Sequence, residues 1–222
     1  MKRYLPLVII AAVALLTLAS GTILYRAKRL PVLTMSKNDM PSAAGAKAIH
    51  VRGPADATVT LEEFGDFQCP ACRTLAGAIN QLEQNYAPRL RVIFRHFPLK
   101  SHQHAREAAL ASEAAGLQGR FWQMHDLLYR EQSVWSKAPE VRLLFDAYAE
   151  TLGLNSDRFE KDMQSDQAKS PITLDQQRAA ELGVTSTPTV FLNDRAVPPS
   201  ALNAPGLRAA IDAATKVKPP PQ

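Results

Sequence analysis

The chain of 222 residues is 46% hydrophobic and 21% charged, which is enough to bury the core of one ordinary domain with extensions. Its formal net charge is +5, but residues 1–47 hold seven Lys or Arg and one acid, so the remaining residues are slightly acidic. The basic residues therefore flank an apolar N-terminal segment. This pattern excludes a basic face of the kind that binds nucleic acid.

The N-terminal segment has the features of a membrane-targeting element. Residues 4–25 are uncharged and mostly apolar, and about 20 such residues can cross the hydrocarbon core of a bilayer. Residues 1–29 are therefore predicted to be a signal anchor or, alternatively, a signal peptide cleaved near the small residues at 19–21. Basic residues on both sides of the apolar run leave its orientation open. Residues 30–54 contain three prolines and show no clear periodicity, which predicts a tether.

The two cysteines of the chain lie in one Cys-x-x-Cys motif, between a predicted strand and a predicted helix. Residues 58–64 are β-branched and apolar, which indicates a strand, and residues 73–86 carry apolar side chains at helical spacing. Pro70 suits the first turn of a helix, because its missing N–H costs nothing there. Cys69 is therefore expected near the N-cap and Cys72 one turn inside the helix.

This placement predicts different chemistry for the two thiols. Unpaired N–H groups and the helix dipole stabilise a negative sulfur at the N-terminus, so Cys69 is the expected low-pKa nucleophile and Cys72 the shielded resolving thiol. A structural zinc site would need four ligands, and there is no second cysteine pair. Haem attachment needs His where Arg73 stands. A purely structural disulfide over so short a loop would constrain the unfolded chain little, so a redox pair without metal is favoured.

The rest of the chain continues the α/β pattern. Residues 90–96 alternate like a second strand, which completes a βαβ unit with parallel strands. Residues from about 101 to 183 carry successive helical patterns and predict an inserted helical subdomain. Within it we expect Ser156 to cap a short helix and Pro171 to open another.

Strand character returns near the C-terminus. Residues 189–192 and 196–197 predict an antiparallel hairpin around a turn at residues 193–194. A last helix is expected from about residue 203 to 215. Residues 216–222 contain three consecutive prolines and predict a disordered tail.

This order of elements resembles the thioredoxin fold of the DsbA-like thiol:disulfide oxidoreductases, with their helical insertion. Residues 184–190, Val-Thr-Ser-Thr-Pro-Thr-Val, look like the family's loop whose proline is cis and faces the active site. Residues 102–132, with Gln-Gly-Arg-Phe-Trp at 118–122, are similar to the BdbD-like membrane-anchored branch. The resemblance implies a thioredoxin-like domain over residues 55–215.

The resemblance also assigns roles to the candidate site residues. It implies Cys69 as the exchanging sulfur, Cys72 as the resolving thiol and Pro188 as a cis proline. A cis proline removes a donor and turns the backbone, which leaves the groups of Thr187 free to pair with a substrate strand. An ordinary proline at the start of a strand is the alternative for Pro188.

Glu63 aligns with the family's buried acid, six residues before the first cysteine. Period-two alternation independently places Glu63 on the face of Val59 and Leu61, and Glu62 on the opposite face. A carboxyl on an apolar face has a raised pKa and can exchange a proton with Cys72. Two solvated acids at a sheet edge are the alternative. Four other conspicuous side chains are interpreted as structural or groove-lining: His102, His104, Trp122 and Trp135.

These observations predict a monomeric extracytoplasmic oxidoreductase that oxidises the thiols of exported, partly folded proteins without a cofactor. It would be held at the cytoplasmic membrane by residues 4–25 and reoxidised by a quinone-linked membrane protein. The domain is placed outside the cytoplasm because an oxidising pair needs an oxidising compartment.

Three other functions stay open. Pro-Ala between the cysteines departs from the Pro-His of strongly oxidising relatives and from the Gly-Pro of reducing ones, so a membrane-fed reductase is a second hypothesis. Thr187 before the proline also resembles the isomerases, although those carry a dimerisation domain for which residues 30–54 leave no room. A tethered binding module or chaperone without turnover is the hypothesis from another class.

Overall fold

The computed structural model describes residues 49–216. The predicted anchor at residues 4–25, most of the predicted tether and residues 217–222 of the predicted tail lie outside this range. Within residues 49–216, no helix has both the length and the apolar character needed to span a membrane.

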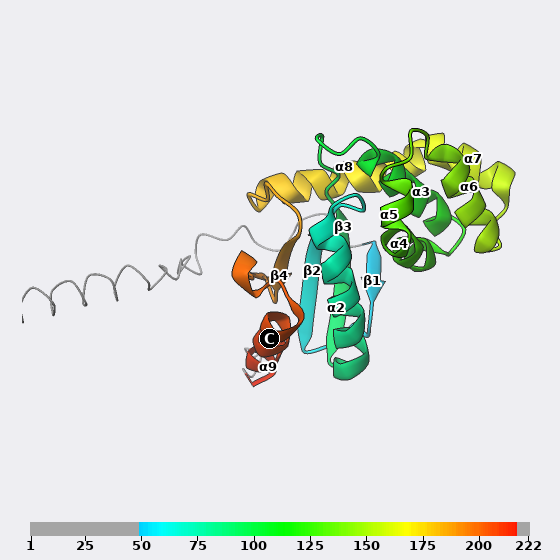
Figure 1. The fold of residues 1–222 in the computed structure, drawn as a ribbon. Helices are drawn as coiled ribbons and strands as arrows, with labels where there is room; N and C mark the ends of the chain where they lie inside the picture. The colour runs from blue at the N-terminus through cyan, green and yellow to red at the C-terminus, as the bar shows by residue number, and fades with distance from the viewer. Residues whose placement is uncertain (1–48, 217–222) are drawn as a thin grey trace, which may run out of the picture. The chain divides into compact units, whose positions relative to one another are not determined.

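A five-stranded mixed sheet forms the centre of the domain, in the order β1-β3-β2-β4-β5 (Figure 1). The central strands β2 (Val59–Gly65) and β3 (Leu90–His96) are parallel, as the βαβ pattern predicts. β1 (His50–Arg52) is antiparallel to β3, β4 (Thr189–Leu192) to β2, and β5 (Arg195–Ala196) to β4.

One face of the sheet is covered by α2 (Pro70–Tyr86) and α9 (Ala204–Lys216). The side chains that pack together there are apolar, which explains the helical spacing of the sequence: Val59, Leu61, Leu75, Ile79, Leu207 and Ile211. Tyr86 Oη donates a hydrogen bond of 2.6 Å to Asp212 Oδ1 and so joins the two helices.

The opposite face of the sheet is covered by α8 (Asp166–Glu181). Phe64 packs there against Ala179, and Glu62 accepts a hydrogen bond of 2.8 Å from Arg95 Nε. Arg95 Nη1 in turn donates to Asp175 Oδ1 of α8 at 2.9 Å. Because β2 is buried on both faces, the alternative of two solvated acids at a sheet edge is wrong.

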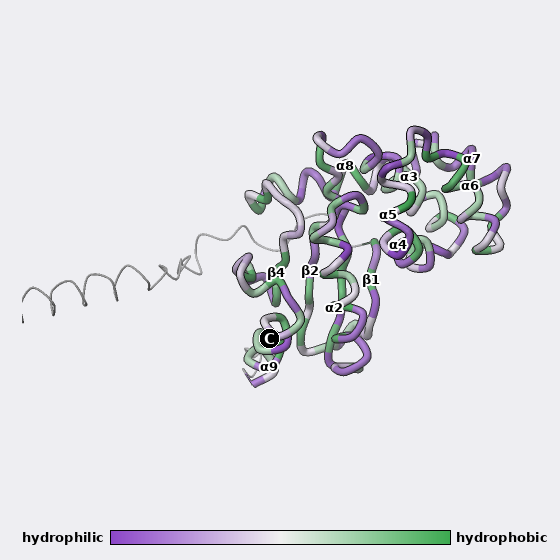
Figure 2. The backbone as a smooth tube through the Cα atoms, viewed as in Figure 1, coloured by the Kyte–Doolittle hydropathy of each residue, from purple (hydrophilic) through white to green (hydrophobic). Residues whose placement is uncertain are grey.

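The inserted subdomain contains α3 (Ala105–Gly116), α4 (Phe121–Arg130), α5 (Gln132–Trp135), α6 (Arg142–Thr151) and α7 (Ser156–Gln164), followed by α8. These helices lie together at the side of β1 and β3 (Figure 1). Figure 2 shows hydrophobic residues along β4 and a mixture of hydrophobic and hydrophilic residues along the inserted helices, as amphipathic helices require. Their core includes Trp135, Phe145 and Phe159, and it is continuous with both cysteines.

Several boundaries differ from the prediction. β1 lies inside residues 30–54, which the sequence assigns to a tether; this three-residue strand is stabilised by its pairing with β3. α8 begins at Asp166 and contains Pro171 in its interior, because the Ser165 side chain caps the helix by accepting from the Ala168 N–H.

Two smaller differences concern caps and turns. Asn155, and not Ser156, is the N-cap of α7, and its side chain accepts a hydrogen bond of 2.8 Å from the Arg158 N–H. β5 is shifted by one residue from the predicted 196–197. The turn before it is confirmed, with positive φ angles of 45° at Asn193 and 63° at Asp194, as a primed hairpin turn requires.

Candidate active site

Cys69 is the N-cap residue of α2, with extended backbone angles, and Pro70 follows at the first helical position. The strand β2 ends at Gly65, so a short turn carries the chain from the sheet to the cysteine. Both cysteines are free thiols; Cys69 is 7% exposed and Cys72 is fully buried. The sequence therefore predicts the position of both thiols correctly.

The surroundings of Cys69 favour its thiolate. Hydrogen bonding from the Cys72 thiol, and then from the N–H groups of Cys72 and Ala71, outweighs the effect of burial and lowers the pKa of Cys69 from 9.0 to about 5. In the neutral form, Cys69 Sγ donates to the Thr187 carbonyl at 3.5 Å. At neutral pH, Cys69 is therefore ionised.

Cys72 has the opposite environment. Burial raises the pKa of Cys72 far above its ordinary range, and the hydrogen bond to Cys69 and the charge of Glu63 act in the same direction. Cys72 is thus a neutral thiol that donates to the Cys69 sulfur. One thiolate and one protonated thiol are held together at the start of α2.

Glu63 lies on the face of β2 that α2 covers and is 2% exposed. Burial, and then the negative charge of Cys69, raise the pKa of Glu63 from 4.5 to about 8. Its Oε1 atom has no hydrogen-bond partner among the described residues. The alternation in the sequence therefore gives the correct face for Glu63, and the carboxyl is protonated at neutral pH.

The loop before β4 lies against Cys69. The peptide bond between Thr187 and Pro188 is cis, as the family resemblance implies, and a second cis bond joins Ala87 and Pro88. Thr189, the next residue, is opposite Phe64 in the pairing of β4 with β2. This register brings the Thr187 carbonyl to the thiol, although the two residues are far apart in the chain.

Two residues that hold the turn of Cys69 were not found from the sequence. The Asp66 carboxylate accepts hydrogen bonds from Gln68 N–H at 2.7 Å, Leu99 N–H at 2.9 Å and His102 Nδ1 at 2.7 Å. The Asp66 carbonyl also accepts from Cys69 N–H at 3.0 Å. An Asp three residues before the N-cap of a helix is a recognisable turn signal that could have identified Asp66.

The second of these residues, Gln132, belongs to the inserted subdomain. From α5, Gln132 Nε2 donates to the carbonyls of Phe67 at 2.6 Å and Cys69 at 2.9 Å. No local pattern in the sequence identifies this residue. His102 and His104 remain structural: His102 bonds to Asp66, and His104 bonds to the Ala138 carbonyl at 2.9 Å.

A second buried polar cluster joins β1, β3 and α3. His50 Nε2 and His96 Nε2 both contact Glu113 Oε1, at 2.5 and 2.7 Å. These are the distances of hydrogen bonds, so the carboxylate is shared by two imidazoles. Burial alone would raise the pKa of Glu113, but the hydrogen bonds from both histidines prevail and lower it to about 2.

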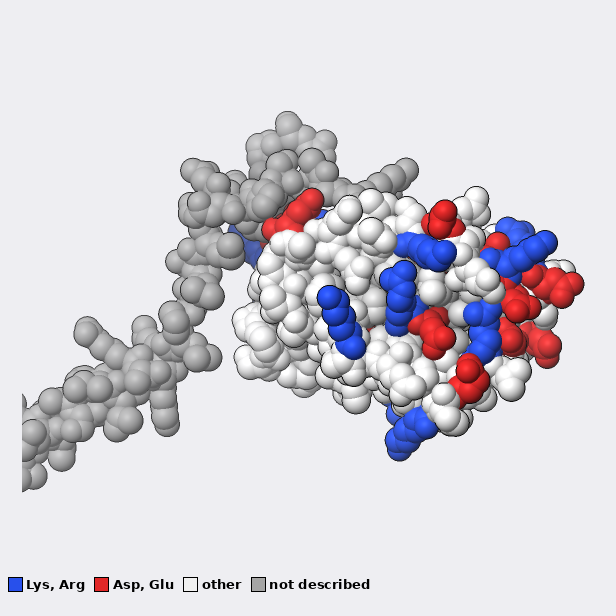
Figure 3. Space-filling model, turned by 90° about the horizontal axis from the view of Figure 1, so that it is seen from above, with Lys and Arg blue, Asp and Glu red and all other residues white. Residues whose placement is uncertain are grey.

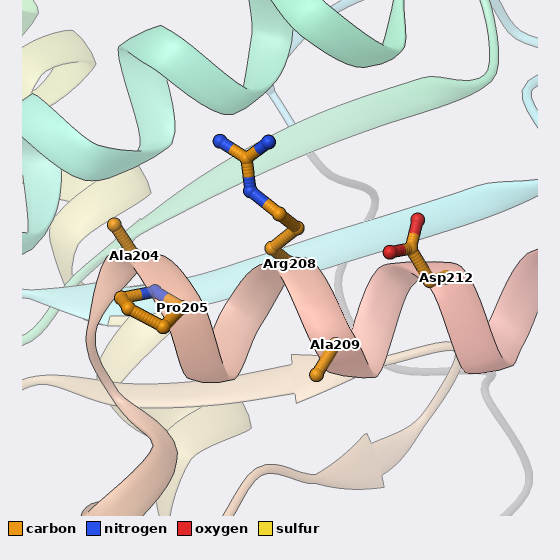
Figure 4. A pocket seen from close by; sticks show the side chains of 5 residues that line it. All are labelled: Ala204, Pro205, Arg208, Ala209 and Asp212. Carbon is orange, nitrogen blue, oxygen red and sulfur yellow. The ribbon is translucent and has the colours of Figure 1, made fainter.

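The hollow along α9 is not part of the candidate active site. A hollow along α9 is lined by Ala204, Pro205, Arg208, Ala209 and Asp212, and it includes neither cysteine (Figure 4). Figure 3, the view from above, shows Lys and Arg side chains spaced singly over the middle of the face and a gathering of both signs toward the inserted helices. This end of the sheet is the one at which α2 begins (Figure 1).

Comparison with solved structures gives the same architecture. A thioredoxin-like oxidoreductase from Silicibacter pomeroyi superposes with a TM-score of 0.65 and 26% identity, covering 76% of this chain and 93% of that chain. BdbD from Bacillus subtilis gives a TM-score of 0.67 at 23% identity, covering 75% and 92%. DsbA2 from Pseudomonas aeruginosa gives 0.63 at 25% identity, covering 77% and 96%.

Curated relatives of similar sequence are much longer proteins. A Na(+)/H(+) antiporter NhaA 1 from Mycolicibacterium gilvum is 38% identical over 149 residues, which is 66% of this chain and 23% of the antiporter. The NhaA 1 antiporter from Salinispora arenicola is 41% identical over 147 residues, with 66% and 22% covered. The chain therefore spans about a quarter of the length of these relatives and resembles one segment of them.

The family assignment rests on a match over most of the chain. The family model described as thioredoxin matches residues 46–213, which include both cysteines, Glu63 and the cis-proline loop. The DsbA-like resemblance seen in the sequence is confirmed by the solved structures. The chain belongs to the thioredoxin family, and its structure is that of the DsbA-like thiol-disulfide oxidoreductases with an inserted helical subdomain.

Proposed function

We propose that this chain exchanges disulfides with protein substrates through Cys69 and Cys72 and works as a thiol oxidase. The observation that carries the proposal is the contrast between the two thiols. The pKa of Cys69 is lowered to about 5, whereas burial raises the pKa of Cys72. A stabilised thiolate is a good leaving group, so a disulfide that contains Cys69 is readily reduced and the protein is oxidising.

The exchange takes two steps. A substrate thiolate attacks Sγ of Cys69 in the oxidised protein, the bond to Cys72 breaks, and Cys72 leaves with the electron pair. Its pKa is raised, so it takes the proton of the neighbouring Glu63 carboxyl. A second substrate thiolate then attacks the substrate sulfur of the mixed disulfide. Cys69 departs as a thiolate, and two electrons have passed to the protein.

The surroundings of Cys69 support an extended peptide as substrate. The backbone of Thr187, before the cis bond to Pro188, lies beside the sulfur and precedes β4. Extended peptides commonly bind to such an exposed backbone edge.

The cellular setting belongs to the same proposal. An oxidase of this kind would act outside the cytoplasm, held by residues 4–25 and reoxidised by a quinone-linked membrane protein. A membrane-fed reductase uses the same two thiols in the opposite direction. A chaperone without turnover would need only the surface around Thr187.

Equilibration of the folded protein in defined glutathione buffers separates these functions. We expect a reduction potential above about −180 mV, in the range of oxidising disulfide catalysts. A potential near about −270 mV would favour the reductase. Cys72→Ser should accumulate mixed disulfides with substrate, and Cys69→Ser should form none. Exchange that survives Cys69→Ser would overturn the proposal.

A further inference from the structure

The inserted subdomain places one hydroxyl group inside the buried part of the site. Tyr129 of α4 is 3% exposed, and its ring lies 5.0 Å from those of Phe67 and His125. Its Oη atom has no hydrogen-bond partner among the described residues. A buried hydroxyl without a partner lowers the stability of the folded protein, so its presence calls for an explanation.

Tyr129 Oη lies directly over the strand that carries Glu63. A Cβ atom added to Gly65 would come within 3.0 Å of Tyr129 Oη. Gly65 and Glu63 are two residues apart in β2 and therefore point to the same face of the sheet. Glu63 Oε1 and His96 Nδ1 are also buried on this face without a hydrogen-bond partner among the described residues.

Cys72 belongs to the same buried group. Cys72 and Tyr129 pack in one apolar core, together with Phe67 and Phe94. Burial first, and then the nearby Cys72 and Glu63, raise the pKa of Tyr129 well above its ordinary value. The phenol therefore keeps its proton and can only donate to an anion formed beside it.

We infer that Tyr129 is a positioning residue for thiol-disulfide exchange, whose hydroxyl donates a hydrogen bond, directly or through one water, to the negative charge shared by Cys72 and Glu63. The inference rests on the proposed function. When the disulfide opens, Cys72 takes the electron pair and then the Glu63 proton, which leaves the charge on the carboxylate. The Tyr129 proton stays on its oxygen, and Glu63 regains a proton from solvent.

The other titratable groups around Tyr129 do not replace it as donor. Cys69 and Asp66 are the remaining acidic groups near its hydroxyl. His125 packs against its ring, and burial lowers the pKa of His125 to about 4, so the imidazole is neutral in the working range. The hydroxyl is thus the buried donor available to Glu63 from α4.

The test is Tyr129→Phe, which removes the hydroxyl and keeps the ring. In the reduced protein, the carboxyl of Glu63 is titrated by isotope-edited infrared spectroscopy. We expect it to ionise about tenfold less readily in the variant, as the loss of one hydrogen bond to a charged group implies. Opening of the Cys69–Cys72 disulfide by a peptide thiol should slow by a similar factor near pH 7. Tyr148→Phe, at the edge of the same core on α6, is the matched control and should change neither quantity.

The outcomes distinguish this inference from the proposed function. If Glu63 titrates identically in Tyr129→Phe and in the unchanged protein, the inference is wrong, even where exchange proceeds. If the titration shifts but the unchanged protein exchanges no disulfides, the contact stands and the proposed function fails. Should Tyr129→Phe not fold, 3-fluorotyrosine at position 129 supplies a second readout. The chemical shift of its fluorine must then change over the same pH range in which Glu63 ionises. A chemical shift that does not change when Glu63 ionises overturns the inference.

Discussion

Glu62 and Glu63 are neighbours in one strand, yet their carboxyl groups face opposite sides of the sheet. Glu62 bonds to Arg95 on the α8 face, at 2.8 Å. Glu63 has an unpaired oxygen on the α2 face, where burial raises its pKa to about 8. The same residue type therefore pairs with an arginine in one position and, in the proposed function, transfers a proton in the next.

Exchanging each acid for its amide should separate these roles. Glu63→Gln removes the proton donor for Cys72, so the rate of disulfide exchange near pH 7 should fall at least tenfold while the protein stays folded. Glu62→Gln should leave the rate nearly unchanged and lower the free energy of unfolding by about 1–3 kcal/mol, because it weakens a buried pair. Stopped-flow exchange and urea unfolding measure the two effects. Equal rates for both variants would show that Glu63 transfers no proton.

At the scale of elements, the inserted helices reach the redox site through α5. Gln132 donates to the carbonyls of Phe67 and Cys69, on both sides of the turn. Gln132→Met keeps most of the volume and removes both donors. We expect it to lower the unfolding free energy by about 1–3 kcal/mol and to raise the pKa of Cys69, since the turn is held less firmly. The ultraviolet absorbance of the thiolate follows this titration.

Gln123→Met is the matched control for that change, because Gln123 is an exposed residue of α4. It should leave both the stability and the Cys69 titration as they are. Identical Cys69 titrations in the Gln132 variant and the unchanged protein would mean that the insertion does not position the thiol.

Glu113 ties a second set of elements together, by joining β1 and β3 to α3. Its pKa is lowered in the folded state to about 2 from an ordinary 4.5. A depressed carboxyl pKa contributes stability that is complete above the unfolded value and is lost as the pH falls through the folded value. The free energy of unfolding should therefore decrease between about pH 4.5 and 2.

Glu113→Gln should abolish that part of the pH dependence and destabilise the protein at pH 7. It should also speed the amide exchange of β1. Glu107→Gln, at an exposed position of the same helix, is the control, and its free energy of unfolding should still decrease at acid pH. If the free energy of unfolding of Glu113→Gln still decreases at acid pH as in the unchanged protein, the decrease is caused by other carboxyl groups.

At the scale of the whole molecule, features encoded locally were predictable and long-range contacts were not. The start of α2 and the face of Glu63 follow from Pro70 and from alternation in β2. β1 was missed because three residues in a proline-containing stretch carry little signal without the pairing to β3. Gln132 was missed because its partners lie more than sixty positions away in the chain.

The prediction that a helix begins at Pro171 was wrong for a local reason, because helix propensity alone does not include the effect of the Ser165 cap. The Ser165 cap starts α8 five residues earlier, and the proline ring lies in a buried part of the helix. The family resemblance supplied the cis bond at Pro188, which the residues alone left open. The membrane anchor that charge and composition indicate at residues 4–25 lies outside the described residues and stays a prediction.

The stability of the whole domain should depend on its redox state in an unusual direction. Folding lowers the pKa of Cys69 from 9.0 to about 5. This stabilisation of the reduced protein is absent below the folded pKa, grows as the pH rises above it and is complete above the unfolded value. At pH 7 it amounts to about 3 kcal/mol, at about 1.4 kcal/mol per pH unit above the folded pKa. The oxidised protein has no thiolate and lacks this contribution.

Loop closure by the disulfide opposes this effect. A loop as short as Cys69–Cys72 constrains the unfolded chain by about 2 kcal/mol. We therefore expect the reduced protein to be the more stable form at pH 7, by about 1 kcal/mol, and the oxidised protein to be the more stable form at pH 4, where the thiolate is lost. Urea unfolding of residues 47–222 with and without reductant at the two pH values measures this reversal. If the oxidised form is more stable at both, the thiolate is not strongly stabilised by folding, and the reductase becomes the better reading of this site.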